Sequence, residues 1–156
     1  MNAIKRLKGE RGAELIEFAL VFPLLLFIIL GIVDFGFLFQ RMEVVTNAAR
    51  EGARIAVLPG YCNPLTIQNR VRDYIEAGGL PTAGGKLVPA TVADITVTVS
   101  AGPPAVTVPA VRVGVTYFHD YMFLGPMMSW FGGTSFSSVP VRAQAVMRDE
   151  DPTPCP

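Results

Sequence analysis

The chain has 156 residues, the length of one ordinary domain. Its 13 Lys and Arg residues balance 13 Asp and Glu residues, so the net charge gives no reason to expect nucleic acid as a partner. One His and two Cys residues are few for a His and Cys metal site, and HExxH, P-loop and GxSxG patterns are missing from the sequence. We therefore expect a protein that is not an enzyme and that holds no cofactor or metal.

The most apolar part of the chain runs from Phe18 to Val33, 16 residues without a charge. After Asp34, the sequence FGFLF extends this run to Phe39. A helix rises about 1.5 Å per residue and a bilayer core is about 30 Å thick, so about 20 residues suffice to cross it. Because the run is apolar on every helical face, the sequence predicts a transmembrane helix rather than an amphipathic core helix.

The charges before the apolar run indicate its orientation. Four basic residues and a single Glu lie within positions 1–11, and after the run Arg41 is soon balanced by Glu43. The positive-inside rule then places the N-terminus in the cytoplasm and everything after Phe39 outside. A secretory signal peptide starts in the same way, but no clean small-x-small cleavage site follows at the usual distance. We expect a single-pass protein of the cytoplasmic membrane, in contact with membrane lipid.

The helical pattern continues beyond the membrane segment, because apolar and small residues recur at three- and four-residue steps. The small residues are Ala48, Ala49, Gly52, Ala53 and Ala56. Such residues let another element approach the helix closely, and Glu51 lies one turn from Arg54, with which it could pair weakly. Pro59 and Gly60 end the pattern. The sequence predicts one long helix over residues 13–58, with its first half in the membrane.

Residues 59–148 have the pattern of a small extracytoplasmic α+β domain. The stretch 64–79 has apolar residues at helical spacing and ends in two glycines. Residues 93–100, 110–119 and 139–148 alternate in polarity and predict three strands of an antiparallel meander. One face of that sheet needs the long helix as its cover. The predicted fold is therefore α+β: a long N-terminal helix packed on a small antiparallel β-sheet.

The remaining segments are predicted to be irregular. We interpret residues 82–91 as a loop, residues 101–109 as a linker or an edge, and residues 149–156 as a polar tail. The apolar, turn-rich stretch 120–136 could pack on the domain, touch the membrane surface or face a partner. No nucleophile pattern accompanies the pair His119 and Asp120, so we interpret both as turn residues.

Asp34 and the two cysteines each leave alternatives open. Asp34 could be hydrated at the outer membrane interface, or it could pair with Arg41 or with another subunit; we slightly favour hydration, because charges near a helix end can reach water. Cys62 and Cys155 would both lie outside the cytoplasm, where disulfides persist. A bridge between them would pin the C-terminus near the end of the long helix, and a free pair is the equal alternative.

The segment from Arg11 to Arg54, RGAELIEFALVFPLLLFIILGIVDFGFLFQRMEVVTNAAREGAR, resembles the TadE-like family of bacterial pilus-assembly proteins. These are minor pilins or pseudopilins of tight-adherence (Flp-type) pili, which are similar to type IV pili. The resemblance rests on the Gly-to-Glu spacing before the apolar run, on the Asp-Phe-Gly after it, and on one block of seven residues. That block is Ala48, Ala49, Arg50, Glu51, Gly52, Ala53 and Arg54. A TadF-like or TadG-like role stays open.

The resemblance implies a pilin-like fold and processing by a prepilin peptidase, with cleavage between Gly12 and Ala13. Residues 1–12 would then be a leader peptide, and Glu17 and Phe18 would be the fifth and sixth residues of the mature chain. The new α-amino group of Ala13 could pair with Glu17 of a neighbouring subunit and fix the axial register of a filament. Glu17 could equally pair with its own N-terminus or the helix dipole, or serve only as an interfacial carboxylate.

The implied partners are the prepilin peptidase, other pilin subunits and the tight-adherence assembly machinery. The competing interpretation is an uncleaved single-pass membrane-anchored module that binds a partner or acts as a scaffold within a secretion system. Retention of residues 1–12 would favour that second interpretation. A membrane-tethered enzyme is the third interpretation, but it needs a constellation of polar residues that the sequence does not display.

Overall fold

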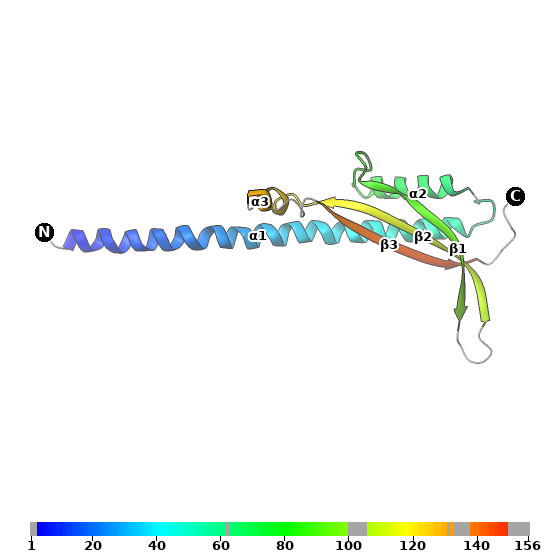
Figure 1. Cartoon of the computed structure of the whole chain (residues 1–156), viewed down its shortest axis with the longest axis horizontal. Helices are drawn as coiled ribbons and strands as arrows, with labels where there is room; N and C mark the ends of the chain where they lie inside the picture. Colours follow the sequence, from blue (N-terminus) through cyan, green and yellow to red (C-terminus); the bar gives the residue numbers. More distant parts are fainter. Residues whose placement is uncertain (1–2, 62, 100–105, 131, 133–137, 150–156) are drawn as a thin grey trace.

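A computed structural model describes residues 3–61, 63–99, 106–130, 132 and 138–149. The elements are α1 (Ala3–Ala56), α2 (Pro64–Ala77), β1 (Leu87–Val99), β2 (Val106–Asp120), α3 (Leu124–Trp130) and β3 (Ser138–Arg148). Figure 1 shows α1 as a long rod whose C-terminal part lies in a head made of α2 and the sheet, while its N-terminal part extends away from the head. The predicted α+β architecture is confirmed.

Helix α1 differs from its prediction mainly at its start. It has 54 residues, so it is about 80 Å long. It begins at Ala3, within the expected leader, and remains helical through Pro23. It ends at Ala56, two residues before the predicted end, in a turn where Leu58 N–H donates to the carbonyl of Ile55. Gly60 then takes a positive φ of 86°, which turns the chain toward α2.

The three strands form one antiparallel sheet in the order β1-β2-β3, as predicted. At its centre, Val113 of β2 lies between Val92 of β1 and Ala145 of β3. Strand β1 begins at Leu87, so the interpretation of residues 82–91 as a loop is wrong for its second half. An irregularity between Val88 and Thr91 shifts the register there and accommodates Pro89, which has no N–H to donate to the sheet.

The hydrophobic core lies between the sheet and the two helices α1 and α2 (Figure 1). Strand β2 supplies its inward face with Val111, Val113, Val115 and Tyr117, as the alternation predicts. Helix α2 begins after Asn63, whose side chain accepts a hydrogen bond from Leu65 N–H at 2.9 Å. Its buried side chains recur at four-residue steps: Ile67, Val71 and Ile75.

Candidate membrane anchor and assembly site

The N-terminal half of α1 exposes an apolar surface that no soluble protein of this size would normally leave in water. Large apolar side chains are exposed from Leu15, with 68% of its surface accessible, to Phe39, with 65%. Within the described residues, α1 is the one helix that is long and apolar enough to cross a membrane, and none of its most apolar stretch is buried. This half of α1 is therefore compatible with a single-pass membrane anchor.

The residues of the expected cleavage and pairing site lie at the start of this exposed surface. Ala13 and Glu17 are exposed, and the bond between Gly12 and Ala13 lies inside α1. Among the described residues, Glu17 has no hydrogen bond or ion pair. The ring of Phe18 stacks on that of Phe22 one turn later, with centroids 5.3 Å apart. The described part of the fold thus brings no partner to Glu17, and its assigned roles stay predictions.

Asp34 is not hydrated, which corrects the interpretation that we favoured from the sequence. Its side chain is fully buried, and its carboxylate accepts three backbone hydrogen bonds from the turn before α3 and from its first residue. The donors are the N–H groups of Met122 at 3.1 Å, Phe123 at 3.0 Å and Leu124 at 2.7 Å. Hydrogen bonds to a charged group stabilise by about 1.5–3 kcal/mol each. Asp34 therefore fastens the start of α3 to α1.

Arg41 does not pair with Asp34 but contacts the end of β2. Its guanidinium Nη1 lies within hydrogen-bond distance of Nδ1 of His119, and the ring of Tyr121 stands edge-on to the His119 ring, 5.1 Å between centroids. Because a guanidinium can only donate, Nδ1 accepts and the ring proton lies on Nε2. The Nε2 atom is buried and has no hydrogen-bond partner within the described part of the chain.

His119 and Asp120 are the last two residues of β2, so their interpretation as turn residues is wrong. His119 continues the inward face of β2 and is almost completely buried. Burial, together with the positive charge of Arg41, lowers the pKa of His119 from its ordinary value of 6.5, against a smaller opposing influence of Asp34. The imidazole is therefore neutral at neutral pH and acts as a structural acceptor.

The seven-residue block forms the contact between α1 and the head. Its small residues Ala48, Ala49, Gly52 and Ala53 are buried, as expected for a close approach of other elements. A Cβ atom at Gly52 would lie 2.7 Å from Cγ2 of Val71 in α2 and 3.1 Å from Cγ1 of Val113 in β2. The backbone of α1 therefore touches α2 and β2 at a point where no side chain fits.

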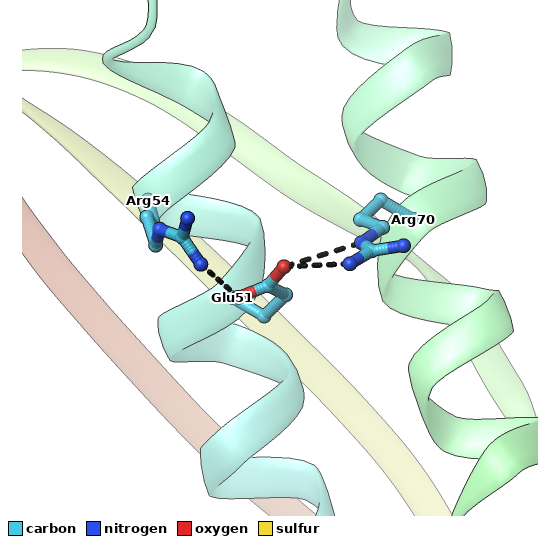
Figure 2. A network of polar contacts seen from close by, with 3 residues as sticks. All are labelled: Glu51, Arg54 and Arg70. Carbon is cyan, nitrogen blue, oxygen red and sulfur yellow. Dashed lines mark hydrogen bonds and ion pairs between the residues drawn. The ribbon is translucent and has the colours of Figure 1, made fainter.

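The charged residues of the block lie at the edge of this contact. Figure 2 shows the carboxylate of Glu51 between two arginines: Oε1 accepts from Arg70 Nη2 at 2.9 Å, and Oε2 lies 3.5 Å from Arg54 Nη1. The pairing of Glu51 with Arg54 is confirmed. Arg70 was missed, because it comes from α2 and no sequence spacing reports a contact between two helices. Arg50 is exposed and reaches Asn47 at 3.4 Å.

Two further expectations concern the cysteines and metal ligands. Cys62 and Cys155 both lie outside the described residues, and their bridge stays a prediction. Over the parts of the chain that the structure describes, no three His, Cys, Asp or Glu side chains gather as a metal site would require.

The family described as TadE-like protein matches residues 12–54 of this chain. No curated protein and no solved structure matches the chain. The matched segment begins at the expected cleavage site, includes Glu17 and Asp34, and ends with Arg54 at the end of the seven-residue block. It therefore covers both the exposed apolar half of α1 and the small residues that pack in the head. The resemblance to the TadE-like family is confirmed, and it relates the chain to a pilus-assembly system.

Proposed function

We propose that this Tad pilus-related chain is a minor pilin or pseudopilin that supports assembly of a tight-adherence pilus and performs no catalysis. In this proposal α1 inserts into the inner membrane with its N-terminus in the cytoplasm. The observation that carries the proposal is the division of α1 into a bare apolar half and a half that is locked into the head. Lipid can cover the bare half in the membrane, and helices of other subunits can cover it in a filament.

Processing by a prepilin peptidase would occur between Gly12 and Ala13. The leader carries all four basic residues that precede the apolar run, so its removal would release the helix from the cytoplasmic face. The new α-amino group would then lie one helical turn from Glu17. The exposure of Glu17, without a partner among the described residues, supports pairing with a group on another subunit. Since an unpaired buried charge is costly, such a pair would select one axial register.

The first experiment is to determine the mature N-terminus after expression with the cognate prepilin peptidase. Intact mass and terminal sequencing should show a chain that begins at Ala13. A chain that still begins at Met1 would contradict the pseudopilin mechanism and leave an uncleaved, membrane-anchored binding or scaffold module. A parallel expression without the peptidase is the control, and it should retain residues 1–12.

The second experiment separates assembly from processing. We expect Glu17→Gln to be cleaved normally but to lose incorporation into pili or crosslinking to other subunits. The matched control is Glu14→Gln, because Glu14 is also exposed and lies one turn earlier on the same helix. Equal incorporation of both variants would show that Glu17 has no role in assembly.

A further inference from the structure

Helix α3 does not lie on the head but beside the membrane half of α1. Figure 1 shows it alongside α1, away from α2 and from the body of the sheet. Seven residues from the two helices line an apolar groove of about 380 Å³ between them. They are Phe27, Ile28, Gly31, Ile32, Phe35, Leu124 and Met128. None of them carries a polar side chain, so the groove offers nothing to a polar ligand.

The level of this groove along α1 follows from the helical rise. If the bilayer core begins just after Glu17, Phe27 lies nine residues beyond Phe18, which is about 14 Å into a core of about 30 Å. By the same reckoning Phe35 lies about 26 Å into it. The part of α1 that faces α3 is therefore the part that crosses the outer half of the bilayer. This step rests on the proposal that α1 spans the membrane.

Some polar groups of α3 and of the turn before it have hydrogen-bond partners, which a lipid environment favours. The first N–H groups of a helix have no partner within the helix, and each unsatisfied group costs several kcal/mol in hydrocarbon. Here Asp34 accepts from the N–H groups of Met122, Phe123 and Leu124. The hydroxyl of Ser129, the only hydroxyl in α3, donates to the carbonyl of Pro126 at 2.6 Å. Helix α3 contains no charged residue.

We propose that α3 is a second membrane element, which lies in the outer half of the bilayer with phospholipid acyl chains in its groove against α1. The turn before α3 continues the same surface, since Met122 exposes 58% of its area. Asp34 is then a carboxylate inside the membrane boundary, and its burial under three N–H donors removes the need for water. The exported chain thus returns to the bilayer between β2 and β3.

The chain contains a single tryptophan, Trp130, which is the last residue of α3 and reports its depth without any substitution. The full-length protein is reconstituted at a low protein-to-lipid ratio in phosphatidylcholine and phosphatidylglycerol vesicles. Lipids brominated along the acyl chain should quench Trp130 fluorescence strongly, and aqueous iodide should quench it weakly. A neighbouring subunit would be rare at this ratio, so protection from both quenchers would overturn the proposal in favour of burial against protein.

Two reporter variants with the same fluorophore calibrate the measurement. Trp130→Phe combined with Leu26→Trp places the reporter in the apolar run of α1, and Trp130→Phe combined with Tyr61→Trp places it at the far end of the head, where Tyr61 is exposed. We expect bromolipid quenching of Trp130 to match the first reporter and to exceed the second several-fold. Strong quenching at residue 26 with iodide quenching at Trp130 would overturn the role of α3 and leave the anchor intact. Iodide quenching at both would overturn the anchor itself.

Discussion

The two halves of α1 are built from residues of different size, because they face different surroundings. Between Leu15 and Phe39 the helix presents large apolar side chains that remain exposed. From Val45 to Ala53 its buried positions hold Val, Ala and Gly, so that α2 and β2 can approach the backbone. One continuous helix thus exposes large apolar side chains in one half and packs small residues against protein in the other. The change in side-chain size marks where the head begins.

Asp34 and Arg41 lie at the junction of the two halves and connect α1 to the end of β2. Asp34 is buried, although its neighbours Val33 and Phe35 are exposed. Arg41 contacts His119 at the end of the inward face of β2. Arg41 therefore holds the end of β2, and Asp34 holds the segment that follows it. Substitutions at this junction and on either side of it test whether the two halves of α1 differ in this way.

The largest effect is expected for Asp34→Ala, which leaves three backbone N–H groups without their acceptor. If the free energy needed to open the turn before α3 falls by about 3 kcal/mol, its amides exchange about 100-fold faster. Hydrogen exchange of Met122, Phe123 and Leu124 in detergent micelles measures this directly. Asp94→Ala is the matched control, since Asp94 is exposed on β1. Unchanged exchange in Asp34→Ala would show that the three hydrogen bonds do not hold α3.

The next effect compares the same substitution in the two halves of α1. Gly52→Val places a side chain against Val71 and Val113, and overpacking of this kind typically costs about 1–3 kcal/mol. Gly36→Val is the control, because a Cβ atom at Gly36 has no neighbour within 4 Å among the described residues. Any change in helix propensity is shared by both variants, so the difference in their thermal unfolding reports packing alone. Equal melting temperatures would contradict the division of α1.

A smaller effect concerns the pH dependence of the junction. Burial and Arg41 lower the pKa of His119 in the folded chain, with a minor contribution in the same direction from Lys86, whereas Asp34 and Asp120 act to raise it. As the pH falls below 6.5, the unfolded chain binds a proton that the folded chain resists, so the free energy of unfolding decreases until the folded pKa is reached. Above 6.5 this contribution is constant.

His119→Asn is the variant that isolates this titration, because an amide oxygen can replace the Nδ1 acceptor but does not titrate. We expect its free energy of unfolding to change less than that of the unsubstituted chain between pH 7.5 and pH 5.5. Denaturant unfolding at both pH values measures how the free energy of unfolding of each chain changes with pH. The carboxylates are common to both chains, so their contribution cancels when the two changes are compared. Parallel pH dependence in the two chains would show that His119 does not contribute.

Much of the fold could be predicted because it depends on local periodicity. The three-to-four-residue pattern predicts α1 and α2, and the alternation of Val111, Val113, Val115 and Tyr117 predicts the inward face of β2. The beginning of β1 was missed, because Pro89 normally argues against a strand and is tolerated here only at an irregularity. The register between strands depends on contacts across the whole sheet, and a local sequence pattern carries no information about those contacts.

The junction could not be predicted, because its contacts join residues far apart in the sequence. Helix α3 is short and contains Gly125 and Pro126. The N–H groups at its start donate to Asp34, which lies 88 to 90 positions earlier in the sequence. Its sequence alone offers little reason for a helix. Hydration of Asp34 was the reasonable expectation while its donors were unknown. The predicted strand over residues 110–119 ends at His119, so the assignment of His119 to a turn conflicted with the strand prediction, and the inward alternation in fact continues from Tyr117 to His119.

The smallest effect is expected at the rim of the packed half. Arg70→Ala removes the hydrogen bonds from Arg70 Nε and Nη2 to Glu51 Oε1, but half of the Arg70 side chain is exposed, so the free energy of unfolding should fall by only about 0.5 kcal/mol. Arg72→Ala, at an exposed position two residues later on α2, is the control. Added salt should reduce the difference between the two variants, because it screens exposed charges. A loss of several kcal/mol in Arg70→Ala would mean that the ion pair, rather than the small residues around Gly52, holds α2 to α1. The packed half of α1 would then depend on charge as the junction does, and side-chain size would not be what separates the two halves.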